Sequence, residues 1–246
     1  MSGSWVLFIL ILLSSLPVIA VYVWFRLAKY QFSLYRFLFA LLAGAAAFFP
    51  ALLLQEMLPF SLNGSRMTLF YQVFVRIAFT EELSRLFALI IFFWISARIT
   101  SSKSSQPLSL DLTIEANATG LVAGLGFALI ENAVYAASDI TTLPLRLITT
   151  AAVHAACGAR IGSAAVMLRS SPTQAILRIF TATAIHGIYN MMVTMPGFSQ
   201  LAAVLIAASA LATVILTIIG GWSKATALDN HQEAIAGELD KNSENY

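Results

Sequence analysis

The chain has 246 residues and a formal net charge of +2, with 59% hydrophobic and only 11% charged residues. Soluble domains carry roughly a quarter charged residues, so this composition excludes an ordinary soluble fold, because too few polar side chains remain to cover a core. The basic residues are scattered, which argues against a nucleic-acid partner. The single cysteine, Cys157, excludes an internal disulfide and a multi-cysteine metal site.

Apolar runs of about 20 residues follow one another, and each is long enough to cross a hydrocarbon core of roughly 30 Å. In lipid such runs must form helices or a closed barrel, and they lack the alternation over about 10 residues that is typical of barrel strands. The sequence therefore predicts an all-α polytopic transmembrane bundle of about seven spans within a single domain, 1–222: near 4–25, 37–55, 70–97, 116–138, 146–168, 174–195 and 200–222. Residues 223–246 are acidic and poor in apolar residues, and we expect a disordered cytoplasmic tail there.

Lysine and arginine are distributed unevenly between alternate connections. One side holds Arg26, Lys29, Arg36, Arg98, Lys103, Arg169, Arg178, Lys224 and Lys241, and the other side holds only Arg66 and Arg146. By the positive-inside rule the first side is cytoplasmic, which places the N-terminus outside and the C-terminus inside. We expect a multi-pass protein of the plasma membrane.

Ionisable side chains lie within four of the predicted spans, although a charge at the bilayer centre costs at least about 2.5–3.5 kcal/mol. They are Arg76, Glu81, Glu82 and Arg85 in the third span, Glu131 beside Asn132 in the fourth, His154 and Arg160 in the fifth, and His186 with Asn190 in the sixth. Helical spacing puts Gly120 and Gly124 on the face of Glu131, and Gly158 and Gly162 on the face of His154. Small residues let helices approach closely, so these faces are predicted to point inward.

These ionisable residues are also predicted to lie at similar depths in the membrane. Counted at about 1.5 Å per residue from the outer end of each span, Glu131, His154 and His186 lie roughly 10–14 Å deep. Glu81 and Glu82 lie about 16–18 Å deep. Structural ion pairs on separate helices have no reason to share a layer, so the sequence predicts one polar pocket in the outer half of the membrane.

Three kinds of function fit such a pocket. Peptide hydrolysis needs a general base, an acid and donors for an oxyanion; two carboxylates in one site can divide the acid and base roles, and His with Glu can also bind zinc with an open water position. Glu and His relays also occur in proton-coupled transporters and channels. A non-catalytic membrane scaffold is the third alternative.

The motifs themselves resemble a known family. Glu81-Glu82-Leu-Ser-Arg85 matches an EExxR pattern, Phe127 to Asn132 matches FxxxEN, His154 opens the fifth span, and His186 to Asn190 matches HxxxN. In this order, over 70–195, they resemble the PrsW-type intramembrane proteases, relatives of the CAAX prenyl endopeptidases and the bacterial immunity-type membrane proteases. PrsW-type proteins more often have Lys where Arg85 stands. The prenyl endopeptidases have His where Glu131 stands, which argues against CAAX-protein processing.

This resemblance implies an endopeptidase that performs site-1-type cleavage of a single-pass membrane protein, such as an anti-sigma factor, near the extracytoplasmic side. The catalytic set it implies is Glu81, Glu82, Arg85, Glu131, His154, His186 and Asn190. Glu81 or Glu82 would activate water, Glu131 would assist proton transfer, and His186 with Asn190 would hold the oxyanion, with His154 in either of the last two functions. The favoured glutamic mechanism requires no cofactor. The alternative is a metal mechanism, with zinc or another divalent ion held by candidates from Glu82, Glu131, His154 and His186.

Overall fold

The computed structural model describes residues 3–30, 32–60, 65–100, 110–138, 141, 143–194 and 200–243, and within these ranges it contains helices and connections but no strand. The predicted all-α class is confirmed. The first apolar run forms α1 (Gly3–Ser14) and α2 (Leu16–Leu27), which are separated at Ser15. Pro17 in the first turn of α2 lacks a backbone donor, so the chain starts a new helix there.

The next two helices begin at serine caps. Ser33 accepts a hydrogen bond from the Arg36 backbone at 3.2 Å and starts α3 (Leu34–Met57). Ser65 does the same for α4 (Arg66–Phe70), accepting from Thr68 at 3.1 Å. Side-chain oxygens at this position satisfy the free amides of a helix N-terminus.

The continuous helical segment that begins with α4 changes its helix type twice. It continues as a π-helix, η1 (Tyr71–Phe79), and then as α5 (Thr80–Thr100). π-helical turns are rare and often occur at functional sites. Here η1 ends immediately before Glu81 and Glu82, which therefore occupy the first turn of α5.

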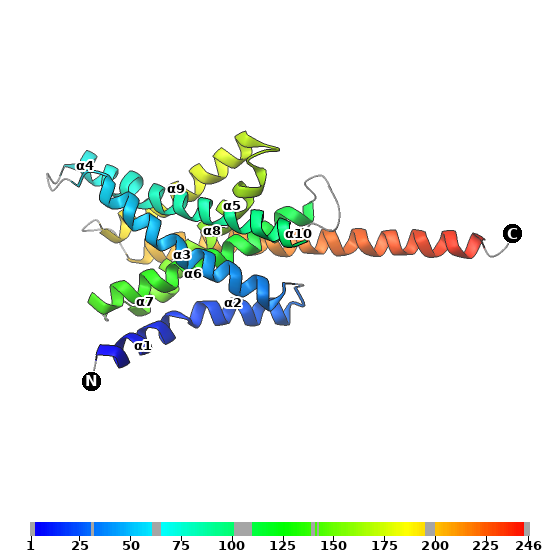
Figure 1. Ribbon diagram of the computed structural model, residues 1–246, viewed down its shortest axis with the longest axis horizontal. Coiled ribbons are helices and arrows are strands. Elements are labelled where there is room, and N and C mark those ends of the chain that lie inside the picture. The colour runs from blue at the N-terminus through cyan, green and yellow to red at the C-terminus, as the bar shows by residue number, and fades with distance from the viewer. Residues whose placement is uncertain are drawn as a thin grey trace.

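The remaining helices are α6 (Leu110–Ser138), α7 (Leu143–Ile148), α8 (Thr150–Met167), α9 (Pro172–Thr194) and α10 (Gln200–Ser243). The predicted span 146–168 is thus divided at Thr149. α10 projects far beyond the bundle (Figure 1), and its backbone is helical to Ser243. The disordered tail from residue 223 stays a prediction. Alanine, glutamine, glutamate and lysine favour helix there even without an apolar face.

Among the residues that the structure describes, five helical segments are long and apolar enough to cross a membrane: Phe8–Leu27, Leu34–Met57, Leu112–Ser138, Pro172–Thr194 and Leu201–Ser223. The predicted spans 70–97 and 146–168 are not among them. The first carries most of the intramembrane charges, and α8 is so enclosed by protein that nearly all its residues are buried. A helix that protein surrounds does not need an apolar surface. The count of seven spans and the outward N-terminus stay predictions.

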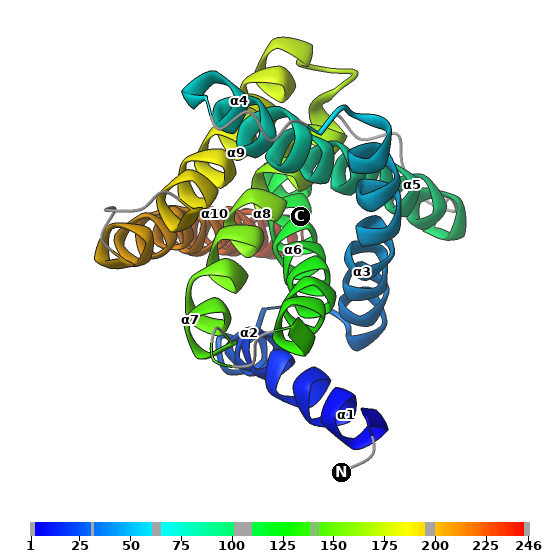
Figure 2. The same ribbon diagram turned by 90° about the vertical axis from the view of Figure 1, so that its left-hand side faces the viewer.

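α6 and α8 lie side by side at the centre of the bundle (Figure 2). A β-carbon added at Gly120 would lie 2.1 Å from the carbonyl oxygen of Gly158, and one at Gly124 would lie 2.0 Å from that of His154. Only hydrogen fits in this seam. The predicted glycine stripes therefore allow the helix carrying Glu131 to approach the helix carrying His154.

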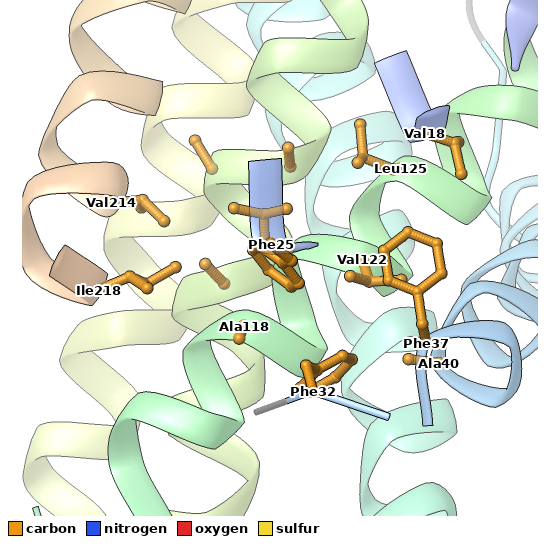
Figure 3. Packing of buried hydrophobic residues seen from close by; sticks show 14 of the residues in the cluster. Val18, Phe25, Phe32, Phe37, Ala40, Ala118, Val122, Leu125, Val214 and Ile218 are labelled. Atoms are coloured by element: carbon orange, nitrogen blue, oxygen red, sulfur yellow. The ribbon is translucent and has the colours of Figure 1, made fainter. Parts of the chain in front are cut away.

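A large apolar cluster packs around α6 (Figure 3). Its buried members come from α2, α3, α5, α6, α8 and α10, and they include Val18 and Phe25 of α2, Phe37 and Ala40 of α3, Val122 and Leu125 of α6, and Val214 and Ile218 of α10. Within it, the rings of Phe25 and Phe37 meet edge to face with centroids 6.3 Å apart. α6 is thus held on both sides, which positions Glu131 on a rigid element.

We expect Gly124→Ala to lower the free energy of unfolding by about 1–3 kcal/mol or more, because overpacking against a backbone forces the helices apart. Unfolding in mild detergent with increasing denaturant measures this change. Gly220→Ala on α10 is the matched control, since an added β-carbon there meets nothing within 4 Å. Equal stability of the two variants would contradict the close seam.

Candidate active site

The predicted ionisable residues come together from four helices. Glu81, Glu82 and Arg85 lie on α5, Glu131 on α6, His154 on α8 and His186 on α9. All six are buried, with Arg85 and Glu82 at 0% exposure and Glu131, the most exposed, at 9%. These six predicted residues therefore share one buried cluster, and its depth in the membrane stays a prediction.

One half of the cluster is built around Glu82. Its Oε1 lies 2.5 Å from the Nη2 atom of Arg85 and 2.8 Å from Nδ1 of His186. A buried charge is strongly destabilising unless it is paired, so Arg85 supplies the compensating charge. The guanidinium also donates to the carbonyl oxygen of His154 at 3.3 Å, which ties α5 to α8. Glu82 therefore holds one nitrogen of the His186 ring in place.

The other half is built around Glu131 in the same way. Its Oε2 lies 2.6 Å from Nε2 of His154, and its Oε1 lies 3.1 Å from Nη2 of Arg146. Arg146, on α7, also donates from Nε to Asn132 Oδ1 at 3.0 Å and stacks over the ring of Tyr135. Each histidine is thus held by one carboxylate, and each carboxylate has its own arginine.

The other nitrogen of each imidazole ring does not bind to Glu82 or Glu131. Nδ1 of His154 has no hydrogen-bond partner, and Nε2 of His186 lies 3.7 Å from Oε2 of Glu81, which also lacks a hydrogen bond. The two imidazole rings meet edge to face with centroids 4.8 Å apart. Gln55 of α3 donates to the other Glu81 oxygen at 3.2 Å and holds that carboxylate from the side.

Glu81, His154 and His186 form a group that can hold a metal ion. Each offers one ligand atom, and these atoms lie within 4.8 Å of one another. Zinc lies about 2.0–2.2 Å from such ligand atoms in proteins, so these three atoms would have to move closer together to hold one ion. Two histidines with one glutamate are a ligand set of zinc hydrolases, and the orphaned buried atoms of Glu81 and His154 fit this role.

Other residues cover and brace the site. Phe127, fully buried, lies under the Arg85 guanidinium at 4.8 Å and against the His154 ring at 5.2 Å. The hydroxyl of Tyr189 on α9 hydrogen-bonds the hydroxyls of Thr149 and Thr150 at 2.7 and 2.8 Å. This contact anchors α9 to the start of α8 and sets the separation of the two histidines.

The structure differs from the sequence-based site at its edges. Asn190 is half-buried, and among the described residues no side-chain hydrogen bond or ion pair joins it to the cluster; its backbone carbonyl accepts from Thr194. The site predicted from the sequence did not include three residues that contact or brace the cluster: Arg146, Gln55 and Tyr189. Arg146 was counted only as a loop cation, and nothing in its spacing pairs it with Glu131. Cys157 is a buried packing residue whose thiol donates to the Ala182 carbonyl at 3.3 Å.

An apolar groove of about 850 Å³ lies between α3 and α5, next to this cluster. Alanines line much of it: Ala43, Ala46 and Ala47 on α3 and Ala88 on α5. Its polar member is Ser84, one turn after Glu81, whose hydroxyl is buried and has no hydrogen-bond partner. Along α5 the groove therefore comes within one turn of Glu81.

Comparison with known proteins gives one match. The model of a family described as PrsW family intramembrane metalloprotease matches residues 33–219. The chain belongs to the PrsW family. The match is wider than the 70–195 predicted from the motifs, and it includes α3 and much of α10. No curated protein and no solved structure matches the chain.

Membership makes this PrsW-family chain a multi-pass intramembrane protease, as the motifs predicted. The family description names a metalloprotease, and the described residues include the Glu81, His154 and His186 group that can hold a metal. The expectation of a mechanism without a cofactor finds no support in either observation.

Proposed function

We propose that this PrsW-family protein is a metal-dependent endopeptidase whose ligands are Glu81, His154 and His186. The observation that carries the proposal is the orientation of the two imidazoles. Each is held at one nitrogen by its own buried carboxylate, so that the other nitrogen is left for the shared centre. Carboxylates that hydrogen-bond the outer nitrogen of metal-ligating histidines are a general feature of zinc sites.

Glu82 and Glu131, predicted as metal candidates, act in this proposal as positioning residues. Each accepts the N–H of its histidine, which selects the tautomer with a free lone pair on the opposite nitrogen. A divalent metal supplies an activated water and polarises the scissile carbonyl. Oε2 of Glu82, which lacks a hydrogen-bond partner, is the oxygen available to accept a proton. Asn190, one turn from His186, stays the predicted oxyanion donor.

We propose that the transmembrane segment of the substrate lies in the groove between α3 and α5. The groove runs along both helices and reaches the turn of α5 that carries Glu81. Its alanines permit close approach of another helix. The unpartnered Ser84 hydroxyl can hydrogen-bond a backbone carbonyl where that helix unwinds for cleavage. A single-pass protein has one such segment, and the family resemblance extends the proposal to site-1-type cleavage of an anti-sigma factor.

The proposal is tested with the purified full-length chain in proteoliposomes that contain a panel of single-pass substrates. We expect a cleavage product whose new terminus maps to the outer half of the substrate span. A chelator should remove the activity, and zinc should restore it. Cleavage that persists after metal analysis shows a metal-free protein would refute the metal mechanism and favour glutamic catalysis.

The groove has its own test. We expect Ala46→Trp, which places a large ring in the groove, to slow cleavage of the membrane substrate about tenfold, equivalent to about 1.4 kcal/mol. Hydrolysis of a short peptide without a transmembrane segment should be nearly unchanged. Ala208→Trp, at an exposed position of α10, is the control. If Ala46→Trp changes neither rate, the groove holds a lipid chain rather than the substrate.

A further inference from the structure

A small polar pocket of about 140 Å³ lies away from the ionisable cluster, between α6, α8, α9 and α10. Its lining residues are Asn117, Arg160, Arg178, Thr213, Val214 and Thr217. Arg160 follows His154 by six residues, or about 9 Å along α8. The pocket therefore lies towards the end of the bundle where α8 is connected to α9, which is the predicted cytoplasmic side.

Two arginines are held in this pocket by neutral groups. Arg160 donates to the carbonyl oxygen of Ala156 at 2.9 Å and to the hydroxyl of Thr213 at 2.8 Å. Arg178 donates to the hydroxyl of Ser163 at 2.9 Å. A guanidinium has five N–H donors, so both side chains retain donors that these bonds do not use. The bonds fix the two side chains in position and leave the remaining donors directed elsewhere.

The charge of these arginines is not balanced. Within the part of the chain that the structure describes, neither forms an ion pair with a carboxylate. Arg85 and Arg146, by contrast, each pair with a glutamate. Two like charges in one partly buried pocket repel each other. Such an arrangement is stabilised when an anion enters.

The other lining groups suit an anion with several oxygens. The Asn117 side chain, 4% exposed, lines the pocket and can donate from its amide. The hydroxyl of Thr217 donates to the Thr213 carbonyl at 2.7 Å and retains lone pairs for a protonated oxygen. Guanidinium groups match the geometry of phosphate oxygens.

From these observations we propose that the pocket binds a phosphate group. The source is either the headgroup of an anionic phospholipid or free phosphate. A lipid is compatible with the surroundings, because α9 and α10 carry exposed apolar side chains close in sequence to the lining residues: Leu177, Phe180 and Leu216. Basic pockets between transmembrane helices on the cytoplasmic side bind anionic headgroups in this way. The proposal is independent of the proteolytic mechanism.

The test uses the full chain, delipidated in detergent, and reads bound lipid by native mass spectrometry. The probes are phosphatidylglycerol, a neutral diglucosyl diacylglycerol, and inorganic phosphate. We expect the wild type to retain phosphatidylglycerol in preference to the neutral lipid. Arg160→Gln and Arg178→Gln should each weaken this retention about tenfold or more, because each removes a charged donor. Arg169→Gln, an exposed arginine at the same end of the bundle, should bind as the wild type does.

Competition distinguishes the two sources. If inorganic phosphate displaces the lipid and raises the unfolding temperature of the wild type but not of the Arg160 and Arg178 variants, the pocket takes free phosphate as well. If phosphate has no effect while the lipid preference holds, the ligand is the headgroup. The proposal is overturned if wild type shows neither lipid preference nor phosphate stabilisation, a comparison that requires no variant to fold. It is also overturned if the variants match Arg169→Gln.

Discussion

Replacing Glu81 with glutamine is expected to abolish cleavage of membrane substrates and to lower zinc affinity by about 100-fold or more. The Glu81 carboxylate lies with Oε2 near His186 and has no hydrogen bond on that oxygen, and a neutral amide is a much weaker ligand for a divalent cation. The metal content of the purified variant, measured by plasma mass spectrometry, and a zinc competition titration report the loss of zinc affinity. The proteoliposome assay reports the loss of cleavage.

Glutamine variants of three other glutamates are the comparisons for this experiment. Glu131→Gln keeps all three ligands but weakens the orientation of His154, so we expect a loss of about 10–100-fold in metal affinity. Glu56→Gln changes an exposed carboxylate at the C-terminal end of α3 and should behave as the wild type. Wild-type metal content and rate in Glu81→Gln would refute the ligand assignment. Loss of metal in Glu82→Gln alone would transfer the ligand role to Glu82.

Arg85→Met is expected to lower the free energy of unfolding by about 3–5 kcal/mol, since it leaves a buried carboxylate without its cation. Arg85 and Glu82 are both fully buried, and their side chains lie 2.5 Å apart. The guanidinium also packs on Phe127 and donates to the His154 carbonyl. Methionine fills much of the same volume, so the effect reports the charge more than a cavity. Denaturant titration in mild detergent measures it.

A second substitution separates charge from packing. In Glu82→Gln with Arg85→Met the buried carboxylate is gone, and we expect a substantial part of the lost stability to return while cleavage stays impaired. Arg66→Met, at an exposed position of α4, should change stability by less than about 0.5 kcal/mol. A double variant as unstable as Arg85→Met would show that Arg85 acts through packing and its bond to His154.

Much of the architecture could be predicted because its causes are local. Long apolar runs require helices in lipid, and helical periodicity alone places Gly124 on the face of Glu131 and Gly158 on the face of His154. The structure confirms the all-α membrane bundle and the close approach of α6 and α8. Membership of the PrsW family, read from four ordered motifs, is confirmed by the family match.

The sequence could not predict the pairing of the charges. Glu81 and Glu82 differ by about 100° around one helix, but which of them faces His186 through which oxygen depends on how α5 packs against α9. Arg146 reaches Glu131 from a short helix that the sequence merged with the next span. η1, which immediately precedes both glutamates, has no signal in the apolar pattern.

The amino-acid sequence by itself determined that this chain lies in a membrane and which helices carry polar faces, since composition and period are properties of single segments; the depth of the ionisable residues stays a prediction. Only the tertiary structure decided that Glu82 and Glu131 each hold one histidine and that Glu81 is left to face both. The reason is physical: a hydrogen bond between helices depends on their relative rotation and separation, and these are set by packing contacts distributed over the whole bundle.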